Sequence, residues 1–101
     1  MTARNPERRP THPGTLLRGE IEARKLNQGQ VADLVGVGRR TINEICRGRR
    51  SMTADMAHRI GKLFGNGPTL WVNMQKAIDI WDAEREHSTD YAKIQTLEIA
   101  R

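Results

Sequence analysis

A single glycine, Gly36, separates two short segments in which apolar residues recur at helical spacing. Val31 and Val35 precede it, and Ile42 and Ile45 follow it. Residues three or four positions apart lie on one face of a helix, so each segment presents an apolar face. Glycine also tolerates the left-handed backbone that a sharp turn between helices requires. The pattern therefore predicts two short helices that meet at a corner and pack against each other.

The residues around this glycine complete the pattern of a helix-turn-helix. Ala32 is small enough for the two helices to approach closely, and Val37 can plug the corner from its apolar side. Asn27 is a suitable N-cap, and Gln30 follows it in capping-box spacing. These features in register predict a helix-turn-helix over residues 28–47.

Three further helices are expected, which makes the fold all-α with five helices around one modest core. Proline at a first turn, and glycine after a last turn, bound them. The expected helices run from Pro13 to near Lys25 with His12 or Thr11 as cap, from Asn27 to Gly36, from Arg39 to Arg47, from Thr53 to the Gly65–Gly67 break, and from Pro68 to about Glu86.

This pattern divides the chain into three regions. Residues 1–11 form a basic N-terminal arm that contains Arg4, Arg8 and Arg9. The prolines in this stretch oppose helix formation. Residues 12–86 form the helix-turn-helix domain with a C-terminal dimerisation helix. Residues 87–101 form a polar tail, ordered by a partner or frayed without one.

Charge is distributed unevenly along the chain. Met1–Lys62 has 13 Lys and Arg against 6 Asp and Glu, whereas Leu63–Arg101 has 4 against 6. Five of the arginines lie within twelve residues, Arg39 to Arg50. A basic half attracts the phosphates of double-stranded DNA, and an acidic half repels them and needs another role.

The second helix of a helix-turn-helix enters the major groove with its first turn, so side chains there are candidates for base readout. Arg39 and Arg40 can each pair with guanine, or else contact only phosphate. Asn43 can read adenine or be a polar surface residue. Gln28 can hold a phosphate at a helix start, or only serve the helix start itself. The full set of predicted DNA-binding residues is Gln28, Arg39, Arg40, Thr41, Asn43, Arg47, Arg49 and Arg50, with the last three as phosphate clamps or a solvated loop.

The fifth helix carries an apolar stripe that includes both tryptophans. Its members close the core of one protomer, form a two-fold interface, or do both. A homodimer would place two recognition helices about 34 Å apart on one face of DNA. The predicted dimer-interface residues are Leu70, Trp71, Met74, Ile78 and Trp81.

Catalysis, metal binding and a cofactor are not expected. The three histidines lie in separate segments, and the only cysteine, Cys46, reads as a packing residue. No run of residues approaches the length of a membrane span, so we expect a cytoplasmic protein without a membrane partner.

Several stretches resemble the HigA-type antitoxins, which belong to the lambda-repressor-like (XRE) class of DNA-binding domains. They are His12–Gly14, Gly36–Ile45, Thr53–Arg59, and Leu70–Gln75 with Asp79–Trp81. The later blocks are the more specific, because Thr-Ala-Asp-Met-Ala and Trp-x-Asn-x-Gln are not general features of helix-turn-helix proteins. The resemblance implies a homodimeric antitoxin that represses its own operon through operator DNA and neutralises a HigB/RelE-like mRNA-cleaving toxin protein.

Three residues depart from the family pattern. Gly38 stands where the family often has a capping serine, Gly29 weakens the second helix, and Thr15 replaces the usual glutamate after His-Pro-Gly.

Five carboxylates lie between Asp79 and Asp90. They form a binding site for a basic toxin, or simply a solvated helix face. Two other functions stay open: a stand-alone transcriptional regulator without a toxin, and a protein-interaction module that no longer binds DNA.

Overall fold

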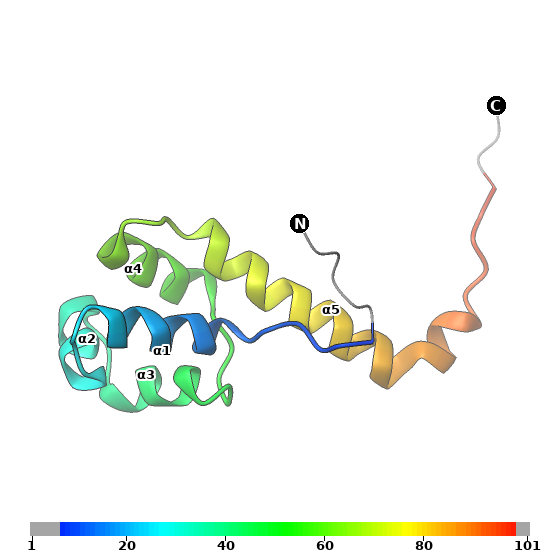
Figure 1. Ribbon diagram of the computed structural model, residues 1–101. Helices are drawn as coiled ribbons and strands as arrows, with labels where there is room; N and C mark the ends of the chain where they lie inside the picture. The colour runs from blue at the N-terminus through cyan, green and yellow to red at the C-terminus, as the bar shows by residue number, and fades with distance from the viewer. Residues whose placement is uncertain (1–6, 99–101) are drawn as a thin grey trace.

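The computed structural model describes residues 7–98, which form five helices and no strand. Four short helices group together at one end of the molecule, and the fifth extends away from them (Figure 1). The all-α, five-helix expectation is thereby confirmed. The helices are α1 (Pro13–Ala23), α2 (Gln28–Val35), α3 (Arg39–Cys46), α4 (Ala54–Phe64) and α5 (Thr69–Ala92).

The expected caps and turns define the ends of the short helices. The Nδ1 atom of His12 accepts a hydrogen bond from the amide of Gly14 at 2.9 Å, which caps α1. Asn27 and Gln30 form both halves of a capping box at 2.8 Å each. Gly36 ends α2 in the left-handed conformation with φ 76°. These contacts satisfy amide and carbonyl groups that a short helix otherwise leaves unpaired.

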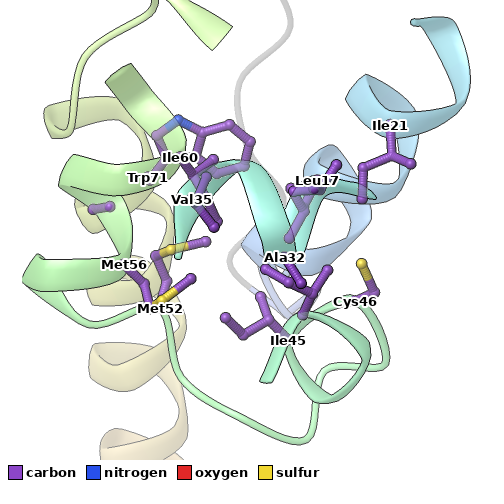
Figure 2. Packing of buried hydrophobic residues seen from close by; sticks show 13 residues of the cluster. Leu17, Ile21, Ala32, Val35, Ile45, Cys46, Met52, Met56, Ile60 and Trp71 are labelled. Carbon is purple, nitrogen blue, oxygen red and sulfur yellow. The ribbon is translucent and has the colours of Figure 1, made fainter. Parts of the chain in front are cut away.

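One apolar core joins α1–α4 to the first half of α5. Trp71 is fully buried, and its indole N–H donates to Oδ1 of Asn66 at 2.9 Å. Figure 2 shows the Trp71 ring above Val35, with Met56, Met52 and Ile45 lower in the view and Ile21 on the opposite side of the cluster. Burial of each large side chain contributes roughly 1.5–3 kcal/mol. The first half of α5 is therefore an integral part of the domain.

Close packing of α1 on α3 depends on a residue without a side chain. A Cβ atom on Gly14 would overlap the backbone carbonyl of Ile45. Gly19, in the same helix, has nothing within 4 Å of the corresponding position. The His-Pro-Gly start of α1 thus sets how near α3 lies to the core.

The last helix is longer than expected. It continues past Glu86 to Ala92, with one residue of non-helical geometry, His87 (φ −124°, ψ 16°), at the predicted boundary. Beyond it, Ile94 and Leu97 are exposed. The three-region division of the chain stays a prediction. Across residues 7–98, no helix combines the length and apolarity needed to cross a bilayer.

Candidate nucleic-acid interface

Buried side chains fix the orientation of α3 on the domain. Ile42, Ile45 and Cys46 are buried against the core, so the opposite face of the helix is solvent-exposed. Burial also raises the pKa of the Cys46 thiol, which favours its uncharged form. Cys46 is therefore a packing residue, as the sequence indicated.

Arg59 of α4 ties the turn of the helix-turn-helix to the domain. Its Nη1 donates a hydrogen bond to the carbonyl of Val35 at 2.7 Å, at the end of α2. Its Nε donates to Oδ2 of Asp55 one turn earlier at 3.0 Å. The bond to Val35 satisfies one of the last carbonyls of α2 and holds the corner in one geometry. No local sequence pattern indicates this contact, because the two residues lie 24 positions apart.

The five clustered arginines all lie on the exposed surface. Arg39 and Arg40 stand at the first turn of α3, and Arg47, Arg49 and Arg50 follow its last turn. The Arg40 side chain is 88% exposed. The structure therefore leaves this basic surface open to a polyanion.

One carboxylate that the sequence reasoning did not single out lies within this basic surface. Glu44 of α3 forms ion pairs with both Arg40 and Arg50. Hydrogen bonds from the Arg50 guanidinium hold the pKa of Glu44 below its usual range. The four-residue spacing of Arg40 and Glu44 on one helix could have predicted their ion pair. The ion pair of Arg50 with Glu44 depends instead on the path of the loop that follows α3.

Two of the predicted DNA-binding residues contact each other. Nδ2 of Asn43 donates a hydrogen bond to Oε1 of Gln28 at 3.0 Å. The contact joins the middle of α3 to the start of α2, and both side chains are half-buried, as is Thr41. Gln28 and Asn43 thus brace the two helices in the free protein, a role that the sequence reasoning did not consider.

The loop after α3 is held against α5 by a buried amide side chain. Oε1 of Gln75 accepts a hydrogen bond from the Met52 amide at 2.8 Å, and its Nε2 donates to Oδ1 of Asp79 at 2.9 Å. Gln75 is only 7% exposed. This bond fixes where the backbone leaves the loop that carries Arg49 and Arg50.

The described part of the N-terminal arm lies along α5 (Figure 1). The Arg9 guanidinium donates two hydrogen bonds of 2.9 Å to the Asp82 carboxylate. Arg85 donates to the backbone carbonyl of Glu7 at 3.2 Å. Arg9 is therefore engaged by α5 in the free protein, whereas Arg8 is exposed and Arg4 lies outside the described residues.

The apolar stripe of α5 divides into two adjacent faces. Trp71 and Ile78 are 0% and 1% exposed within a single chain. Both side chains are covered by their own chain, which is the core role that the sequence left open for them, and the dimer interface stays a prediction. Leu70 is 43% exposed, and Met74 and Trp81 are half-buried. These three residues share a neighbouring face of the helix.

The acidic residues of α5 serve two different purposes. Asp79 and Asp82 bind Gln75 and Arg9, and the Arg9 guanidinium holds the pKa of Asp82 below its usual range. Glu84, Glu86 and Asp90 are exposed. Two of the five carboxylates expected to form a negative surface, Asp79 and Asp82, are thus hydrogen-bonded within the chain. No group of three or more His, Cys, Asp or Glu side chains among residues 7–98 is arranged to hold a metal ion.

Comparison with known proteins agrees with this geometry. Residues 17–71 match the Helix-turn-helix family model. YbaQ of Escherichia coli K12, named as an uncharacterised helix-turn-helix transcriptional regulator, is 32% identical over 89% of this chain and 82% of its own length.

Solved structures narrow the relationship. A HigA-family addiction-module antidote protein from Coxiella burnetii is 35% identical, with TM-score 0.81 over 90% of this chain and 100% of that one. The Pseudomonas aeruginosa antitoxin HigA, solved with the higBA promoter, is 30% identical, with TM-score 0.83 over 89% of this chain and 100% of that one. The chain therefore belongs to the helix-turn-helix family and, within it, to the HigA-type antitoxins.

Proposed function

We propose that this protein is the antitoxin of a type II toxin-antitoxin system, and that it represses its own operon by binding operator DNA. The observation that carries the proposal is the exposed arginine surface on and after α3. The P. aeruginosa relative, which has a similar fold, was solved with the higBA promoter. The protein partner that we propose for this chain is a HigB/RelE-like toxin that cleaves mRNA.

The predicted division of labour among the arginines follows from their positions. Arg39 and Arg40 lie at the turn of α3 that enters the major groove in helix-turn-helix proteins, where a guanidinium can pair with guanine. Arg47, Arg49 and Arg50 lie beyond the other end of the helix, where phosphate contact is expected. The first pair selects the sequence, and the second group contributes affinity for any duplex.

A homodimer completes the operator-binding unit in this proposal. Leu70, Met74 and Trp81 follow one another at spacings of four and seven residues, so they align along one side of α5. Ala77 lies on the same side and is small enough for a second helix to approach. Pairing of two α5 helices through this face would bury the exposed part of Leu70 and give a two-fold symmetric DNA reader.

The toxin is expected to bind away from α3. The exposed carboxylates Glu84, Glu86 and Asp90 lie on the second half of α5 and beyond the arginine surface. Opposite charge on a basic toxin would raise its association rate more than its affinity. Separate surfaces would let one protein bind DNA and toxin by different residues.

A second candidate function is a stand-alone transcriptional regulator with no toxin partner. It is favoured by one observation, the similarity to YbaQ, which is named as a transcriptional regulator. Both functions use α3 in the same way. They differ in whether a toxic protein is encoded beside this chain.

Co-expression separates the two functions. The protein encoded by the adjacent gene should arrest growth when produced alone, and this chain should restore growth and co-purify with that protein. An Arg39→Ala, Arg40→Ala double variant is the matched control, because it should lose operator binding while still restoring growth. Absence of growth arrest or of a complex would remove the antitoxin function and leave the regulator.

A further inference from the structure

Glu44 is the one acidic side chain on α3, and it contacts arginines from two different parts of the chain. Its Oε1 accepts hydrogen bonds from Nε and Nη2 of Arg50 at 3.1 and 2.6 Å. Its Oε2 lies 3.6 Å from Nε of Arg40, one helical turn earlier. A single carboxylate therefore forms ion pairs with a candidate base-reading arginine and with a candidate phosphate clamp at the same time.

The carboxylate lies where DNA would approach. Glu44 and Arg40 are four residues apart on the side of α3 opposite the buried Ile42 and Ile45. A negative charge at this place repels the phosphate backbone. It also neutralises part of the positive charge that attracts any duplex, whatever its sequence.

We infer that Glu44 limits the affinity of the arginine surface for DNA, because it competes with phosphates for Arg50 and, through a longer contact, for Arg40. The inference rests on the proposed operator binding. On any duplex, Arg50 exchanges its ion pair with Glu44 for a phosphate contact, and Glu44 is left close to the phosphates. This exchange does not depend on the base sequence, so Glu44 lowers the affinity for the operator and for random DNA alike.

The size of the effect follows from counterion release. Each phosphate neutralised adds about 0.9 to the slope of log K against log salt, which at roughly 0.15 M salt corresponds to about fivefold in affinity. Replacing Glu44 with glutamine keeps its size and removes its charge. Glu44→Gln should therefore bind any duplex about fivefold more tightly, with a salt slope steeper by about 0.9.

The chain offers a matched control for this substitution. Glu20 of α1 also forms an ion pair with an arginine four residues away, at 2.9 Å to Arg24, and its side chain is 26% exposed, as is that of Glu44. The two glutamates are equally exposed, but Glu20 lies on a different helix from the arginine surface. Glu20→Gln should leave DNA binding unchanged.

The test is fluorescence anisotropy of the wild type, Glu44→Gln and Glu20→Gln on two labelled duplexes across a range of KCl concentrations. One duplex carries the promoter of the protein's own gene, and the other is a scrambled sequence of equal composition. Thermal unfolding of each variant shows that the fold is retained. The inference predicts that only Glu44→Gln gains affinity, by about fivefold on both duplexes, and that its preference for the promoter stays as in the wild type.

Other outcomes would overturn the inference. Equal weakening on both duplexes would mean that Glu44 orients Arg50 toward phosphate, and weakening on the promoter alone would mean that Glu44 reads a base directly. Unchanged binding would mean that the ion pairs have no role in DNA affinity. If the wild type itself shows no preference for the promoter, the proposed operator binding fails, which is a result distinct from the three above.

Discussion

Substitution of Gln75 by leucine tests how the loop that carries Arg49 and Arg50 is held. Leucine keeps the volume but removes the acceptor for the Met52 amide, whose 2.8 Å hydrogen bond is buried. A buried donor left without a partner costs about 1–3 kcal/mol. In a domain of this size each kcal/mol lowers the melting temperature by roughly 4–8 °C. We therefore expect Gln75→Leu to unfold at least about 4 °C below the wild type.

Circular dichroism during heating and during urea titration measures this loss. Asp79→Asn is the control, because asparagine keeps an oxygen acceptor for Nε2 of Gln75 and should change stability by less than about 0.5 kcal/mol. In DNA titrations, Gln75→Leu should also bind all duplexes more weakly, since the loop loses its anchor to α5. An unfolding midpoint of Gln75→Leu equal to that of the wild type would refute this account of the loop.

Three further predictions test the fold and the proposed assembly. Burial lowers the pKa of His12 in the folded protein, so the unfolded chain binds the proton first as pH falls. The stabilising contribution of neutral His12 is therefore present above the ordinary histidine pKa and is lost as pH falls from there through the lowered folded-state pKa. His12→Asn, which still caps α1, should flatten the decline in urea midpoint between about pH 7.5 and 5.5. Gly14→Ala should lower the melting temperature, because its Cβ meets a backbone carbonyl, whereas Gly19→Ala should raise stability by roughly 0.5–1 kcal/mol. Leu70→Glu should shift light-scattering mass from dimer to monomer, and the same change at Ile80, 62% exposed on another face of α5, should not.

Local chemistry made the helices predictable from the sequence. The Asn27–Gln30 capping box, the left-handed Gly36 and the Thr53 cap each act within a few residues, so their signals survive in the linear chain. The fold class followed from those signals, whereas the family followed from the resemblance of blocks such as Thr53–Arg59 to the HigA-type antitoxins. The end of α5 was less predictable, since the polar segment after Glu86 has no strong breaker and the helix resumes beyond His87.

Long-range side-chain contacts were not predictable in the same way. The pairs Arg9–Asp82 and Arg50–Glu44 depend on where loops return, and no periodicity encodes them. The apolar stripe of α5 showed which residues avoid water but not which neighbour covers them. Only the packed domain shows that Trp71 is enclosed by its own chain.

The most direct test of the central claim is a quantitative gel shift with the promoter duplex and a scrambled duplex at several salt concentrations. Arg39→Ala and Arg40→Ala remove candidate base contacts, so at least one should lose roughly 1–3 kcal/mol of preference for the promoter. Arg49→Ala should weaken both duplexes alike and lower the salt slope by about 0.9. If all three variants bind both duplexes as the wild type does, α3 and its loop are not the DNA-reading surface.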